Sequence, residues 1–160
     1  MTLRRRMLAA SVVGALAFLP LAQPAGAGHA TTLEKQLRKK INAYRSSKDK
    51  PTLKMKDVLV TKARAQAEQM AADDQFDPIG DHSSERELTA YANAANCDTA
   101  PFLAEIIAAE ASLDRIIEGW KASRPHNKTM LKKAWERIGT GVFDDGDGTL
   151  WAVVLFCSTK

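Results

Sequence analysis

The stretch WKASRPHNKTML, residues 120–131, says most about how this chain folds. Apolar residues recur at helical spacing from Leu113 to Trp120, so an amphipathic helix should run into the stretch. Pro125 then disfavours continuation of that helix, and the sequence predicts that His126 lies in a polar turn. A histidine between a helix end and the strands expected after it is well placed to line a cleft.

Two apolar segments after this stretch, 138–143 and 150–157, predict an antiparallel hairpin. The connection between them contains Asp144, Asp145 and Asp147, residue types that could suggest a Ca²⁺ site. The twelve-residue EF-hand pattern is absent, however, and a glycine-rich turn accounts for these aspartates.

Upstream of the stretch, hydrophobic periodicity predicts helices over 33–46, 57–72 and 85–95. The third is expected to begin with a capping box formed by Ser84 and Glu87. Residues 102–108 form a short apolar run, rich in isoleucine, that we interpret as a strand. Helices that precede a mixture of strands and one helix indicate the α+β class.

The first thirty residues have the features of a secretory signal peptide. Three arginines precede a short apolar segment, and small residues near positions 27 and 30 offer cleavage sites. We therefore expect a secreted or periplasmic protein with a single domain over 31–160, which does not span a membrane and is a monomer. Without residues 1–30 the chain holds 20 Lys/Arg and 19 Asp/Glu, so its composition does not indicate a nucleic-acid partner.

Charge is nevertheless unevenly distributed along the chain. Residues 33–64 hold eleven Lys/Arg and three acids, whereas residues 65–118 hold two Arg and twelve acids. Solvated helix faces account for this pattern, and a basic face that recruits an anionic surface is the alternative.

Cys97 and Cys157 are the only cysteines. In an exported protein an even pair favours one disulfide, here closing a loop of about sixty residues and adding roughly 3–4 kcal/mol of stability. A catalytic thiol is not expected in an oxidising compartment.

Several segments together resemble the CAP superfamily, also called SCP/TAPS or PR-1-like, in its short bacterial secreted form. The resemblance covers about 41–156 and rests on the order and spacing of its segments. They are INAYR (41–45), DHS (81–83), AEIIA (104–108), the stretch 120–131, IGTGV (138–142) and LWAVVLF (150–156). The resemblance implies a three-layer α-β-α sandwich with a small antiparallel sheet. It also implies a central cleft that in many eukaryotic members holds two His and two Glu and can bind a divalent metal.

This chain departs from that tetrad of two His and two Glu. His82 and Glu105 match one His and one Glu, whereas the second Glu position falls at Ser123. His126 matches the histidine of the bacterial branch. The resemblance therefore predicts a ligand-binding cleft formed by His82, Glu105, Ser123 and His126.

Three of these residues, His82, Glu105 and His126, could hold Zn²⁺ or another divalent metal, because two His and one carboxylate leave an open position for water. A structural hydrogen-bond network among the same residues is the alternative. No catalytic residue is assigned and no cofactor is required.

The leading functional hypothesis is an extracytoplasmic, non-enzymatic binding module for a small lipid-like or cell-envelope ligand. The alternatives are a weak divalent-metal-dependent hydrolase and a structural or adhesion protein of the cell envelope that acts through its basic first helix.

Overall fold

The computed structural model describes residues 30–73, 76–78, 80–97 and 103–159. The expected signal peptide, except for Ala30, lies outside the described residues. At the centre is a four-stranded sheet with the order β1-β3-β4-β2. Its strands are β1 (Lys54–Met55), β2 (Leu103–Glu110), β3 (Arg137–Asp144) and β4 (Leu150–Cys157).

Most of the sheet is antiparallel. β4 pairs along its whole length with β3 on one side and with β2 on the other. β1 is parallel to β3 and pairs only with Arg137 and Ile138, and the sequence did not reveal it. The hairpin and the strand after Pro101 were predicted correctly.

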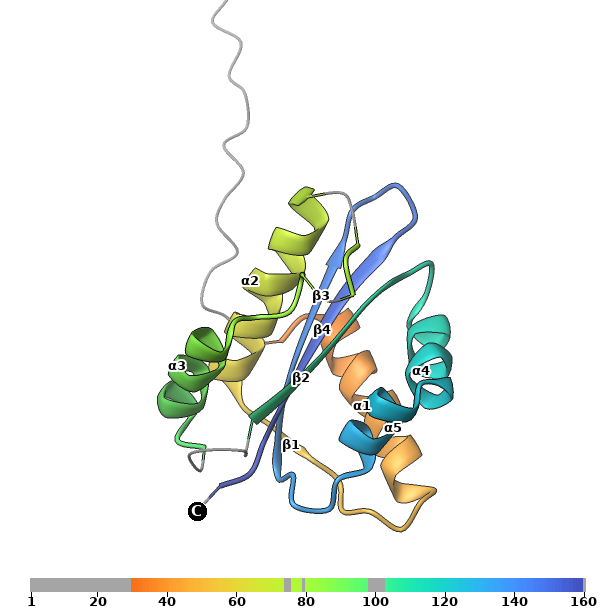
Figure 1. Ribbon diagram of the computed structural model, residues 1–160. Helices are drawn as coiled ribbons and strands as arrows, with labels where there is room; N and C mark the ends of the chain where they lie inside the picture. The colour runs from red at the N-terminus through yellow and green to blue at the C-terminus, as the bar shows by residue number, and fades with distance from the viewer. Residues whose placement is uncertain (1–29, 74–75, 79, 98–102, 160) are drawn as a thin grey trace, which may run out of the picture.

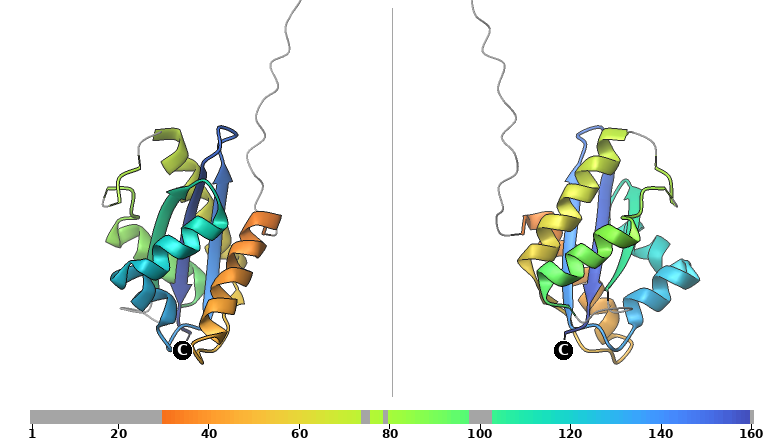
Figure 2. Two further views of the ribbon diagram at one scale, coloured as in Figure 1. Left: turned by 90° about the vertical axis from the view of Figure 1, so that its right-hand side faces the viewer. Right: turned by 60° about the vertical axis from the view of Figure 1, so that its left-hand side comes forward.

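Helices cover both faces of this sheet (Figures 1 and 2). Helices α2 (Asp57–Asp73) and α3 (Glu85–Ala95) pack on one face, where Ile107, Val153 and Leu155 contribute to the core. Helices α1 (Thr32–Ser46), α4 (Leu113–Ala122) and α5 (Arg124–Leu131) pack on the other face. The chain is therefore an α-β-α sandwich of the α+β class, as predicted.

Helix α2 lies directly against β3 because two glycines remove the side chains between them. A Cβ atom on Gly139 would lie 2.3 Å from the Leu59 backbone, and one on Gly141 would lie 2.1 Å from the Ala63 backbone. Both distances are far below van der Waals contact, so the Gly-Thr-Gly sequence sets how closely these two elements approach.

The prediction that His126 lies in a polar turn is wrong. Residues 124–131 form helix α5, and Pro125 occupies its first turn. Proline is favoured at this position because the first N–H groups of a helix have no intrahelical partner and the fixed φ of proline suits the helix. The break before Pro125 is real, but it separates two helices rather than a helix and a loop.

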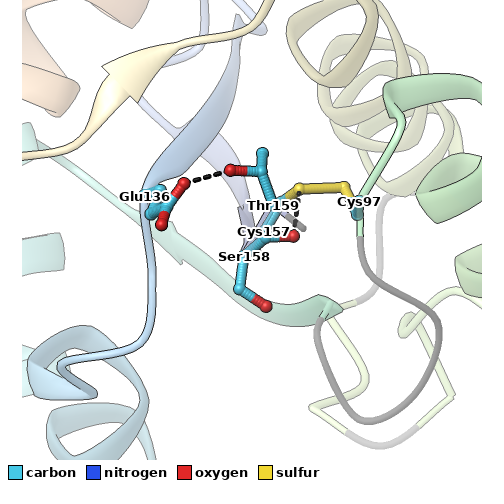
Figure 3. Close-up of a disulfide and its surroundings, with 5 residues drawn as sticks. All are labelled: Cys97, Glu136, Cys157, Ser158 and Thr159. Carbon is cyan, nitrogen blue, oxygen red and sulfur yellow. Dashed lines mark hydrogen bonds between the residues drawn. A yellow bond between two sulfur atoms is a disulfide. The ribbon is translucent and has the colours of Figure 1, made fainter.

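The predicted disulfide is present between Cys97 and Cys157, with Cα atoms 5.7 Å apart (Figure 3). It joins Cys97, which comes directly after the C-cap residue of α3, to Cys157 at the end of β4. Beyond β4, the Thr159 hydroxyl donates a hydrogen bond to Glu136. These contacts fasten residues 157–159 to Cys97 after α3 and to Glu136 before β3.

The three tryptophans are buried, as expected for core residues, and each indole N–H has an acceptor. Trp120 donates to the Ile107 carbonyl and Trp135 to the Thr129 carbonyl. Trp151 donates to Asp145, whose other carboxylate oxygen accepts the N–H groups of Asp147 and Thr149. The aspartates of the hairpin connection therefore shape the turn, as the sequence indicated.

Candidate functional site

Glu105 is the buried centre of the candidate site. It lies on β2, and its side chain is 1% exposed. The Ser83 N–H donates to Oε1 at 2.8 Å, and the Ser83 hydroxyl donates to Oε2 at 2.7 Å. His82 Nδ1 lies 3.0 Å from Oε1. Since a carboxylate can only accept, Nδ1 carries the hydrogen of this bond.

His82 and Ser83 reach Glu105 because the chain before α3 is anchored on α2. The Gln66 amide donates to the Asp81 carbonyl at 2.6 Å, immediately before His82. Helix α3 then starts at the capping box of Ser84 and Glu87, which the sequence predicted. A short segment fixed at both ends thus holds His82, whose side chain is 33% exposed, over the buried carboxylate.

Tyr91 of α3 completes the surroundings of this carboxylate. Burial raises the pKa of its phenol, with a further contribution from the negative charge of Glu87. A hydrogen bond with Ser83 acts in the opposite direction. The phenol therefore stays protonated and extends the network Tyr91–Ser83–Glu105–His82.

His126 lies on α5, and burial lowers the pKa of its imidazole. A positive charge on His82 would repel a second one on His126, which lowers the pKa of His126 further. A neutral imidazole can donate one hydrogen bond and accept another. His126 is thus suited to bind a neutral polar group.

A pocket of about 240 Å³ opens beside His126. The edge strand β2 contributes residues 107–110, and α4 forms a second wall with Ile116, Gly119 and Trp120. Ser123 and His126 lie in its lining at the junction of α4 and α5, and Phe76 and Pro78 close the remaining side. Most of this lining is apolar, and Ser123 and His126 are its uncharged polar members.

The four residues predicted to form one cleft therefore occupy two adjoining places. His82 and Glu105 are in direct contact, whereas Ser123 and His126 line the pocket. The pocket lining does not include His82 or Glu105.

Within the described part of the chain, no three His, Cys, Asp or Glu side chains are grouped so that they could hold a metal ion. His82, Glu105 and His126 do not form such a group, and metal binding by these three residues remains a prediction. Both oxygens of Glu105 already accept hydrogen bonds from Ser83, one of them together with His82. The contact between His82 and Glu105 agrees with part of the alternative interpretation, a structural hydrogen-bond network.

Sequence reasoning quoted Ser83 within the DHS segment but assigned no site role to it, and it assigned none to Tyr91, Phe76 or Gly119. Ser83 could have been identified, because it stands between His82 and a capping serine whose helix was predicted. The other three are brought to the site only by tertiary packing, and no local pattern distinguishes them.

The sandwich and its histidine–glutamate contact describe an α-β-α domain, and comparison with known proteins gives the family. The model of the CAP family, described as the cysteine-rich secretory protein family, matches residues 38–157. The chain belongs to the CAP family. No curated protein sequence matches it.

Solved structures show the same fold. An outer surface protein from Borrelia burgdorferi is 20% identical with a TM-score of 0.66, over 79% of this chain and 92% of that one. A cysteine-rich secretory protein from Staphylococcus aureus is 18% identical with a TM-score of 0.62, over 79% of this chain and 38% of that one.

An extracellular SCP-domain protein from Bacillus anthracis is 19% identical with a TM-score of 0.61, over 82% of this chain and 45% of that one. The chain spans less than half the length of the Staphylococcus and Bacillus proteins. Among the helices in the described residues, none is long and apolar enough to cross a membrane.

Proposed function

We propose that this chain is an extracytoplasmic binding module that holds a small, largely apolar ligand group in the pocket between β2, α4 and α5. The observation that carries the proposal is the lining of that pocket, which is apolar except for Ser123, His126 and a charged rim. Binding pockets for small molecules commonly combine an apolar wall with a few convergent polar groups.

The volume of the pocket limits what it can hold. At about 240 Å³, it has room for on the order of eight water molecules. That is enough for a short acyl, isoprenoid or ring fragment, and too little for a complete lipid. The pocket would thus receive one end of a cell-envelope component whose remainder stays outside.

The polar residues determine the orientation of such a ligand. A neutral His126 and the Ser123 hydroxyl would pair with a hydroxyl, ester or carbonyl group at one end. At the rim, Arg115 is paired with Glu110 through a 3.0 Å hydrogen bond, so these two charges balance each other. The ligand favoured by these features is uncharged and amphipathic.

Gly119 offers a direct test, because it lines the pocket and a Cβ atom added to it would meet nothing within 4 Å. We expect Gly119→Leu to fill the pocket and abolish binding of hexanol, used as a short acyl probe in saturation-transfer NMR. The same change should raise thermal stability slightly, since glycine costs about 1 kcal/mol in a helix interior.

Ala122→Leu is the matched control, because this exposed residue of α4 is outside the pocket lining. It should leave hexanol binding unchanged. His126→Ala should weaken binding by up to about tenfold, the value of one hydrogen bond. Equal hexanol binding by the wild-type protein and Gly119→Leu would contradict the proposal that this pocket binds the ligand. An absence of hexanol binding to the wild-type protein would contradict it as well.

A further inference from the structure

The two helical layers of the sandwich carry opposite charge. Helices α1, α4 and α5 together hold nine Lys/Arg and three Asp/Glu. Helices α2 and α3 hold three Lys/Arg and five Asp/Glu. The fold thus places a net positive charge on one side of the sheet and a net negative charge on the other. The expected mature chain as a whole is almost neutral.

Three of the nine cations in the first layer are not available to a partner. Lys40 and Arg115 form ion pairs with Asp114 and Glu110. Arg45 is fully buried and donates to backbone carbonyl groups of three residues, Pro51, Met130 and Lys132.

The remaining six cations have no carboxylate partner among the described residues. We call them the basic layer: Lys35, Arg38, Lys39, Lys121, Arg124 and Lys128.

Contacts between the helices bring these cations onto one layer of the molecule. The Lys121 ammonium lies 4.8 Å from the centre of the Tyr44 ring, which joins the end of α4 to α1. The Tyr44 hydroxyl donates to Asn127 at 3.1 Å and joins α1 to α5. Figure 2 shows α1, α4 and α5 side by side in front of the sheet.

We propose that the basic layer binds a linear polyanion, a polymer with closely spaced phosphate or carboxylate groups. Six cations without counterions create a positive potential, which is complementary to such a polymer. The acidic layer of α2 and α3 on the far side would repel the polymer, so the molecule binds in one orientation.

A polymer fits this surface better than a bilayer does. Helices that bind in a membrane interface present Trp, Phe or Leu beside their cations. The large hydrophobic residues exposed in the described chain are Phe76 and Phe143, and neither belongs to α1, α4 or α5. The basic layer thus offers charge without an apolar face to insert.

The experiment measures binding of fluorescently labelled long-chain polyphosphate to the full mature protein by anisotropy. We expect the affinity to fall at least about tenfold between about 50 and 200 mM salt, because several counterions are released on binding. Charge reversal in the basic layer should lower affinity at least about tenfold at constant salt. The test variant combines Lys35→Glu, Lys39→Glu and Lys128→Glu.

The matched control makes the same change in net charge on the opposite side of the sheet, with Lys56→Glu, Lys62→Glu and Arg86→Glu. It should retain most of the affinity, and both variants should keep their circular dichroism spectra and bind hexanol. An equal loss in both variants would overturn the proposal, since it would show an effect of net charge alone. Absence of polyphosphate binding, or binding only to phosphatidylglycerol vesicles, would also overturn it.

Discussion

Two buried carboxylates lie near opposite edges of the sheet, and their partners differ. Near β3, Glu34 is fully buried and binds Arg64 of α2 through two hydrogen bonds of 2.8 and 2.7 Å. On β2, Glu105 is equally buried but is held by Ser83 and His82. Glu34 also accepts the Thr31 N–H in the capping box of α1, but its side-chain partner Arg64 is permanently charged. The partners of Glu105 are hydrogen-bonding groups and a titratable imidazole.

The Glu34 pair closes an edge that β1 leaves uncovered. β1 pairs only with Arg137 and Ile138, so within the described residues the rest of β3 has no strand neighbour on this side. There the Thr140 hydroxyl donates to the Glu34 carbonyl, and the pair of Glu34 with Arg64 joins the two helical layers around the edge. This arrangement is fixed and its role is structural.

The Glu105 network has a different position, because it adjoins a pocket. His82 is partly exposed, and a positive charge on it would lower the pKa of His126 in the pocket lining. Equal burial therefore does not imply equal function. We therefore expect the Glu34–Arg64 pair to contribute mainly to stability, and the Glu105 network to be the more sensitive of the two to a ligand in the pocket.

The largest effect is expected at Glu34. Glu34→Leu leaves the Arg64 guanidinium buried without a counterion, and this should lower the free energy of unfolding by about 3–5 kcal/mol. Urea unfolding followed by circular dichroism measures the change. The double variant Glu34→Leu/Arg64→Met removes both charges and should recover most of the loss. A single variant as stable as wild type would show that the pair contributes nothing to stability.

A smaller loss is expected at Glu105. Glu105→Gln keeps the shape and removes the charge, so one amide N–H₂ group faces donors from Ser83 or His82. We expect the free energy of unfolding to fall by about 1–3 kcal/mol, because a buried N–H donor of Ser83 or His82 then faces another donor and loses its acceptor. Hydrogen exchange should accelerate at residues 82–84 and stay unchanged in α1.

Glu87→Gln is the control for this variant, since Glu87 is exposed and glutamine also suits its capping position. It should change stability by less than about 0.5 kcal/mol. A larger loss for Glu87→Gln than for Glu105→Gln would reverse the ranking of the two sites.

The sequence predicted most of the fold because its local signals agree with its tertiary structure. The capping box at Ser84 and the helical spacing before Trp120 both lie where expected. The prediction that His126 lies in a turn was wrong because a proline can either end one helix or occupy the first turn of the next. Only the packing of Met130 and of the Trp135 indole against this segment decides between them.

The site was less predictable for a physical reason. His82 and Glu105 were expected to meet, and they do so through a direct contact. The pocket depends instead on where α4 and α5 pack against the edge of β2. No local sequence pattern therefore marks Gly119 or Phe76 as a pocket residue. Likewise, burial of Glu34 opposite Arg64 follows from a contact between residues 30 positions apart.

The smallest effect concerns the pH dependence of stability through His126. Its folded pKa lies below the ordinary value of 6.5, so the unfolded chain binds a proton more readily. Stability from this group is present above about pH 6.5 and is lost as the pH falls toward the folded pKa. In His126→Gln, the decrease in melting temperature between about pH 7.5 and pH 5.5 should be smaller than in wild type.

Since His82 contributes to the shift, His82→Gln should also reduce this pH dependence, although less than His126→Gln does, because burial is the larger cause. Glu34→Leu should shift the whole melting curve without changing its slope in this pH range, because Arg64 does not titrate there. A steeper slope in His126→Gln than in wild type would mean that the imidazole is protonated in the folded state. The pocket would then favour an anionic ligand over a neutral one.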